Sequence, residues 1–174
     1  IAILTVISAI VLFSFSGFNQ GAALNRSVRE LSLALRRAQN MSLVVSQIEV
    51  GEEPNTVIVI PPAVGVRLTK NASSYLLFAD LKISRDNLYS GTGEKIGSEL
   101  IFERGVRVES LTDQAGTTHD LIHILFTAPE ATITLSDKTG ALLGSNSIEI
   151  KLVPPAGEPK KTVTVRTSGQ IRVK

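Results

Sequence analysis

Two histidines four positions apart, His119 and His123, have the spacing that comes closest to a metal-binding motif. On a helix this spacing would place both imidazoles on one face. The sequence LIHILF around His123 is instead typical of a β-strand, in which residues four apart are separated by about 13 Å. The chain has no cysteine and no third histidine to complete a zinc site. We therefore expect no metal site and no cofactor.

Carboxylates are the next residues that could support chemistry. Five Asp and Asn residues could offer oxygens to calcium, but the spacing of an EF-hand loop is missing, and turns favour the same residue types. They are Asp80, Asp86, Asn87, Asp113 and Asp120. Three glutamates in a β-rich context, Glu94, Glu99 and Glu103, are predicted to be surface residues rather than an acid–base pair. With no nucleophile–base or phosphate-loop motif either, we expect no enzyme.

The C-terminal segment is basic, and it follows an acidic body. Residues 156–174 carry a net charge of +4, whereas residues 51–155 carry −4. The basic side chains are candidates for contacting DNA phosphates without reading sequence. The alternative, which we favour, is a solvated strand face whose charges block aggregation. The five residues are Lys160, Lys161, Arg166, Arg172 and Lys174.

The first 18 residues, IAILTVISAIVLFSFSGF, form an almost continuous apolar run, and the first 25 carry no charge. A membrane span needs about 20 apolar residues. A buried core helix is the alternative, but a globular helix usually has a polar face and this segment has none. We therefore predict a helix that inserts into a membrane. Because the chain starts at Ile1 rather than Met, we expect a processed or truncated N-terminus.

The apolar pattern continues as one helical stripe beyond this run. The stripe consists of Leu24, Val28, Leu31, Leu35, Ala38, then Met41 or Ser42, and Val45. Charged residues lie off the stripe, and no proline occurs before Pro54. We predict a single helix from Ile1 to about Ser46, roughly 70 Å long, whose second half packs against a soluble domain.

After Gly51 the pattern changes to short runs rich in Val, Ile and Thr between turn residues, which predicts β-strands. The runs are Thr56–Ile60, Gly65–Leu68, Tyr75–Phe78, Leu100–Glu103, Val106–Leu111, Leu121–Thr127, Ala131–Leu135, Ile148–Val153, Thr162–Thr167 and Gln170–Val173. The fold class is therefore α+β, with one long helix on an antiparallel β domain of two small sheets. We divide the 174 residues into a helix at 1–50, with an apolar half (1–20) and an amphipathic half (21–50), and a globular β-rich domain at 51–174.

The last hairpin can be assigned a register. A three-residue loop, Thr167–Gly169, pairs Val165 with Ile171 and Val163 with Val173, and makes one face uniformly apolar. Gly169 then fills the left-handed position of the loop. Arg166, Arg172 and Lys174 share the opposite, solvent face with Thr162, Thr164 and Gln170.

Several segments, in their order and spacing, resemble the type IV pilin-like proteins. IAILTVISAIVL resembles the interior of their N-terminal segment, and LSLALRRAQNMSL (Leu31–Leu43) resembles the helix signature of the GspH/FimT-type pseudopilins. YLLFAD (Tyr75–Asp80), ELIFERGVRV (Glu99–Val108) and VTVRTSGQIRV (Val163–Val173) resemble their β domain and closing strand pair. The loop after Asp80, LKISRDNLYSGTGE, is longer than expected for that group.

This resemblance implies a minor pilin or pseudopilin, a structural subunit of a type IV pilus or a type II secretion pseudopilus. It implies a single-pass anchor in the bacterial inner membrane with the β domain outside the cytoplasm, then assembly with other pilin subunits. Prepilin peptidase would cleave roughly ten residues before Ile1, next to a residue that becomes N-methylated. The helix packing residues would be Ile1, Ile3, Leu4, Ile7, Ile10, Val11 and Phe13.

Two alternatives stay open beside this structural role. One is a minor pilin that binds DNA for uptake through the basic C-terminal hairpin, which the resemblance allows. The other is a membrane-tethered extracytoplasmic β domain that is unrelated to pili.

Overall fold

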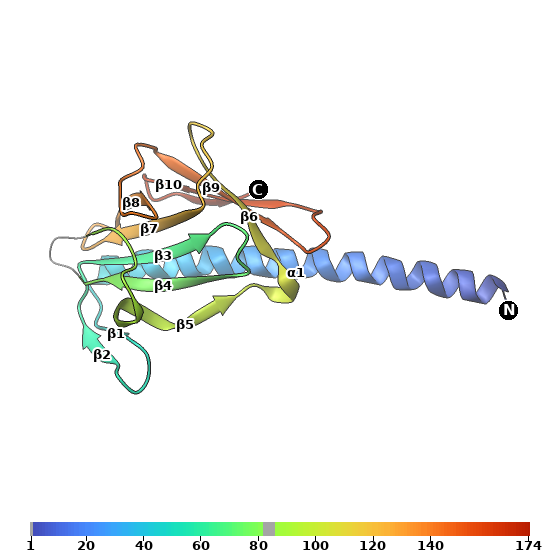
Figure 1. Cartoon of the computed structure of the whole chain (residues 1–174), viewed down its shortest axis with the longest axis horizontal. Helices are drawn as coiled ribbons and strands as arrows, with labels where there is room; N and C mark the ends of the chain where they lie inside the picture. The colour runs from blue at the N-terminus through green and yellow to red at the C-terminus, as the bar shows by residue number, and fades with distance from the viewer. Residues whose placement is uncertain (1, 82–85) are drawn as a thin grey trace.

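One long helix, α1 (Ala2–Val44), dominates the computed structural model. The structure describes residues 2–81 and 86–174, with side chains from Asn19 onward. The C-terminal half of α1 lies against β-sheets, and its N-terminal half projects beyond them (Figure 1). At 43 residues, α1 is about 65 Å long. The single helix is thus confirmed over 2–44, and its predicted first residue, Ile1, lies outside the described residues.

The apolar stripe of α1 faces the sheets. Leu24, Val28, Leu31, Leu35 and Ala38 are each at most 2% exposed. Of the two alternatives at the next position Ser42 is the more buried, at 2%, and Met41 is partly buried. The predicted stripe departs from the buried face of α1 only at its last residue, Val45.

Val45 is 43% exposed rather than buried. The reason is that α1 ends at Val44 and that Val45 itself has a left-handed φ of 50°. This conformation turns the chain off the helix axis and takes the valine side chain out of the stripe. The helix therefore ends two residues before the predicted Ser46.

A five-stranded antiparallel sheet in the order β5-β4-β3-β7-β8 forms the largest layer. Its strands are β3 (Ala63–Thr69), β4 (Ser74–Asp80), β5 (Lys95–Ile101), β7 (Leu121–Thr127) and β8 (Thr132–Asp137). One face packs on α1 through residues such as Val66, Leu77 and Ile124. The other face carries Phe78 and Leu125, with Tyr89 packed over them.

A four-stranded antiparallel sheet in the order β11-β10-β9-β6 forms the second layer. Its strands are β6 (Arg107–Asp113), β9 (Ser147–Val153), β10 (Lys161–Arg166) and β11 (Ile171–Val173). A short two-stranded sheet pairs β1 (Ile48–Val50) with β2 (Val57–Val59). The described residues therefore hold three sheets where we expected two.

Two local predictions of strands need correction. β1 had no counterpart among the predicted runs, and it falls inside the segment 1–50 that we assigned to the helix. The predicted strand Leu100–Glu103 is displaced: β5 ends at Ile101, and Glu103 begins a 3₁₀ turn, η2 (Glu103–Gly105). A second 3₁₀ turn, η1 (Thr92–Glu94), leads into β5. Gly97 and Ser98 interrupt the apolar residues of β5, so a search for apolar runs did not predict where this strand begins.

The predicted register of the C-terminal hairpin is confirmed. Val163 pairs with Val173, and Val165 pairs with Ile171, across the loop at 167–169. Gly169 has a φ of 91°, the left-handed conformation that the loop requires. Val163 and Val165 are fully buried against the core. On the opposite face Thr164 is only 7% exposed, which corrects its assignment to a solvent position.

Candidate functional site

The first candidate site is the N-terminal half of α1, which projects from the β domain (Figure 1). The side chains that we predicted to pack there, Ile1, Ile3, Leu4, Ile7, Ile10, Val11 and Phe13, lie outside the residues whose side chains the structure describes. Within the described part of the chain, no helix is long and apolar enough to span a membrane.

Polar contacts fix the direction in which α1 leaves the β domain. The buried Ser27 Oγ accepts a hydrogen bond of 3.0 Å from the backbone N–H of Glu103. The Arg26 guanidinium lies 3.2 Å from the Glu103 carboxylate. Near the other end of the helix, Ser42 Oγ donates a bond of 2.6 Å to the carbonyl of Phe126 in β7. The helix is thus held at both ends of its packed half, and the apolar segment before it has a defined orientation.

An apolar groove runs between the outer face of α1 and the edge strand β5. Its volume is about 620 Å³, and Leu33, Ala34, Leu100 and Ile101 line it together with Tyr75 and Leu77. Leu33 and Ile101 are 64% and 74% exposed. Sequence reasoning missed this groove. The signal that could have found it is Leu33, an apolar residue of the helix that lies off the buried stripe.

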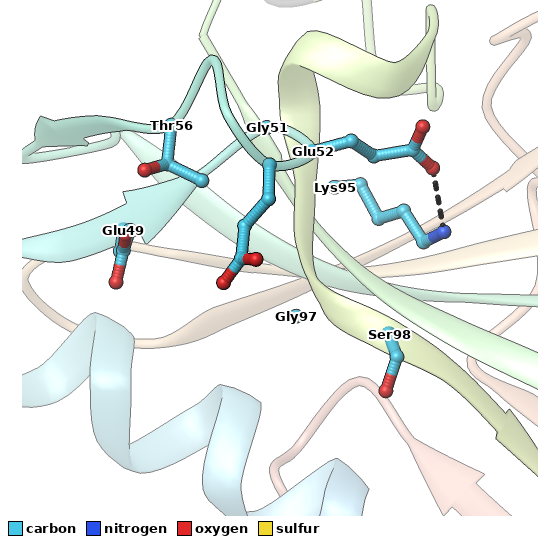
Figure 2. A pocket seen from close by; sticks show the side chains of 8 residues that line it. Glu49, Gly51, Glu52, Thr56, Lys95, Gly97 and Ser98 are labelled. Atoms are coloured by element: carbon cyan, nitrogen blue, oxygen red, sulfur yellow. Dashed lines mark hydrogen bonds and ion pairs between the residues drawn. The ribbon is translucent and has the colours of Figure 1, made fainter.

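A second cavity, of about 350 Å³, lies beside β1 and the start of β5 (Figure 2). Glu49, Glu52 and Glu53 line it, and Lys95 is the lining cation. The Lys95 ammonium lies 2.8 Å from the Glu52 carboxylate, and this hydrogen bond raises the pKa of Lys95. Because Lys95 is engaged by Glu52, the walls of this cavity present acidic groups to solvent.

The two histidines lie in unrelated environments, so the structure does not bring them together. His119 Nε2 is 3.2 Å from a carboxylate oxygen of Asp113. The other carboxylate oxygen of Asp113 accepts bonds of 2.9 Å from the backbone N–H groups of Ala115 and Thr117. These bonds contribute to a lowered pKa for Asp113. Asp113 therefore acts as a turn-forming residue.

His123 is 2% exposed, and burial lowers its pKa to about 4. Its Nδ1 lies 3.1 Å from the carbonyl oxygen of Asp137. A carbonyl can only accept, so Nδ1 carries the proton and the ring is neutral at physiological pH. Over residues 2–81 and 86–174, no three His, Asp or Glu side chains are grouped so that they could hold a metal ion.

The loop between β4 and β5 is organised by carboxylates. Asp80 accepts a bond of 3.2 Å from the backbone N–H of Asn87, and Glu94 accepts one of 2.6 Å from that of Ser90. The Ser90 hydroxyl donates to Asp86 over 2.8 Å. Each of these carboxylates therefore accepts a hydrogen bond from an N–H or O–H group of the same loop.

Glu94 corrects our expectation of a surface residue, because it is only 7% exposed. Burial, reinforced by the neighbouring Asp86 and Asp80, raises its pKa. Glu99 accepts a bond of 2.6 Å from the Ser74 hydroxyl, and Glu103 pairs with Arg26. The three glutamates are therefore separate structural groups and do not converge on one point. Asp120 is exposed.

The basic residues of the C-terminal segment are partly neutralised by carboxylates. Lys160 lies 2.8 Å from Glu109 and 3.6 Å from Glu158, and the first contact raises its pKa. Lys174 lies 3.6 Å from Glu149. Arg166 and Arg172 are exposed on the strand face, and Lys161 is half-buried. The structure thus places the predicted residues along one hairpin, but intersperses them with acidic groups.

The long helix packed on antiparallel sheets is a pilin-like fold, as a comparison with solved structures shows. The crystal structure of the type IV minor pilin FimU from Pseudomonas aeruginosa PAO1 matches this chain with a TM-score of 0.50. The match covers 90% of this chain and 92% of that one, at 12% sequence identity. A scan of protein-family models gave no match, and a search of curated proteins gave none.

Proposed function

We propose that this chain is a minor pilin or pseudopilin of the GspH/FimT type, a structural subunit of a type IV pilus or a type II secretion pseudopilus. The observation that carries the proposal is the shape of the molecule: half of α1 is anchored in the β domain and the other half projects from it (Figure 1). The sequence of the projecting half is apolar and uncharged. Such a helix needs an apolar environment.

That environment changes during the life of the subunit. Before assembly, the apolar segment holds the protein in the inner membrane with its β domain outside the cytoplasm. During assembly, the helix transfers from lipid into a bundle formed by the helices of neighbouring subunits. The β domain remains on the outside of the resulting fibre. Pilin-like folds are typically non-enzymatic, and the lack of catalytic activity is part of this proposal.

The experiment is cross-linking within the projecting helix. Because the 174 residues contain no cysteine, Ile10→Cys introduces a single thiol into this part of the full-length gene product. In membranes of cells that assemble fibres, a benzophenone maleimide attached to Ile10→Cys should, on irradiation, join this helix to neighbouring pilin helices. Ala115→Cys, in an exposed loop, is the matched control and should remain monomeric. If Ile10→Cys is also monomeric while fibres form, the fibre role is excluded.

A DNA-binding role for the C-terminal hairpin is the alternative proposal, and it has less support. Its five basic residues share their surface with Glu109, Glu149 and Glu158, which lowers the local positive potential. Arg166 and Arg172 are the exposed pair on which it depends. It predicts retention of the protein on duplex DNA at low salt that falls in Arg166→Ala/Arg172→Ala. Retention that is equal in both proteins, or absent, would rule it out.

The third hypothesis, a tethered β domain unrelated to pili, is disfavoured by the likeness of the fold to FimU. It makes a different prediction from the first two. Under it, the leader of the gene product would remain uncleaved, and Ile10→Cys would find no pilin partner.

A further inference from the structure

Two hairpins of opposite charge lie on opposite sides of α1 (Figure 1). The first, which we call the acidic hairpin, is β1, β2 and the loop between them, residues 48–60. It carries three glutamates and no basic residue. The second, the basic hairpin, is β10, β11 and their loop, residues 161–174. It carries four basic residues and no acidic one.

The acidic hairpin exposes apolar side chains that nothing in the described chain covers. Ile48 and Val50 face the core, at 5% and 1% exposure. Ile58 pairs with Glu49 on the outward face and is 70% exposed. Val57 and Ile60 are 59% and 57% exposed. β2 is hydrogen-bonded to a single strand, β1, so its other edge is open. An exposed apolar edge strand is a common site of pairing with another chain.

The basic hairpin offers positively charged side chains that complement the glutamates of the acidic hairpin. Arg166 and Arg172 are exposed on its outward face, beside the buried Thr164. Glu149 of β9 pairs with Thr164 on the same face, so one acidic residue borders the two arginines. Arg and Lys side chains also present long aliphatic stems, which can cover apolar groups while their charged ends stay in water.

We propose that the acidic hairpin of one subunit docks on the basic hairpin of a second copy of this chain. This inference rests on the proposed function and names a contact between subunits that the proposed function does not specify. Glu49 and Glu53 meet Arg166 and Arg172, and Ile58 packs on the stems of the basic side chains. The charge pairing sets the register, and the apolar contact excludes water.

The proposed contact joins two different surfaces and is therefore heterologous. Its repetition gives an open helical row, or a ring if the rotation between copies closes, rather than a two-fold dimer. The acidic hairpin lies at the end of the molecule away from the N-terminus, and the C-terminus lies closer to the projecting helix (Figure 1).

The test uses two cysteine variants of the full-length protein in membranes, Ile58→Cys and Gln170→Cys. Neither substitution removes a charge from either hairpin. A mixture of the two single variants should give a bis-maleimide dimer that neither variant gives alone. The double variant should give a ladder of trimers and longer species. The control replaces Ile58→Cys by Ala115→Cys and should give no product. The proposal would be overturned if the mixture gave no dimer, or if the only cross-linked product contained a different envelope protein.

Charge reversal makes the test specific to the proposed pairing. Glu49→Lys/Glu53→Lys in one variant, or Arg166→Glu/Arg172→Glu in the other, should lower the dimer yield by about tenfold. The two reversals together should restore it. Lys138→Glu, an equally exposed change elsewhere, should leave it unaltered. A yield that ignores these reversals refutes the pairing. If Ile10→Cys still cross-links, the fibre role stands and this contact alone is wrong.

Discussion

Burial of His123 makes the stability of the β domain dependent on pH. The ring is 2% exposed, donates from Nδ1 to the Asp137 carbonyl, and packs edge-on against Phe78 with 5.6 Å between ring centroids. Burial is the main reason that its pKa falls to about 4, and the positive charge of Arg67 lowers it further. The carboxylates of Asp137 and Asp86 act in the opposite direction.

The magnitude follows from the difference between the folded and unfolded pKa values. The unfolded chain binds a proton at His123 near pH 6.5, but the folded chain does so only near pH 4. The free energy of unfolding is therefore unaffected above pH 6.5 and falls as the pH drops toward 4. The total loss is about 3 kcal/mol, of which about 2 kcal/mol is lost by pH 5.

The assay is urea unfolding of the full chain in a non-ionic detergent, followed by circular dichroism between pH 7.5 and 4.5. His123→Gln cannot titrate, so its stability should lack this fall, although it starts from a lower value at pH 7.5. His119→Gln is the control and should retain the fall. Glu94 acts in the opposite sense, because its raised pKa makes its protonation stabilise the folded state. It is present in both proteins and cancels in the difference. Equal slopes for wild type and His123→Gln would refute the reasoning.

Three further predictions concern packing and backbone conformation, and each is measured by urea unfolding. Leu31→Ala should lower the free energy of unfolding by about 2–5 kcal/mol because Leu31 is fully buried, whereas Leu33→Ala, at 64% exposure, should change it by less than about 0.5 kcal/mol. Gly65→Ala should cost about 1–3 kcal/mol, since a Cβ there would lie 2.6 Å from the Phe78 ring, and Phe78→Leu in the same chain should recover part of this loss. Ser42→Ala should cost about 1 kcal/mol by removing the bond to the Phe126 carbonyl, and an unchanged midpoint would show that water replaces it.

The long helix and the C-terminal hairpin could be predicted because local sequence determines both. The i, i+3, i+4 stripe from Leu24 to Ala38 specifies which face of α1 is buried. The hairpin register follows from a two-residue periodicity together with one glycine at a left-handed position, Gly169. In both cases a shift of one residue would expose a whole apolar face, so few alternatives remain.

The features that sequence reasoning missed depend on contacts between distant segments. β1 is three residues long and exists because β2 and the core cover Ile48 and Val50. Glu94 carries no local sign of burial, since its environment is created by the return of the loop that precedes β5. The groove beside α1 likewise requires β5 to lie next to Leu33, which no spacing along the helix indicates.

The measurement that tests the fibre role most directly is mass spectrometry of fibres sheared from cells that express the full-length gene product with an active prepilin peptidase. The account predicts peptides of this chain in the sheared fraction, with an N-methylated terminus roughly ten residues before Ile1. It also predicts that a charged substitution, Ile10→Asp, removes the chain from that fraction while the protein remains in the membrane. A protein that stays in the membrane fraction with an unprocessed N-terminus, while fibres assemble without it, would contradict the account.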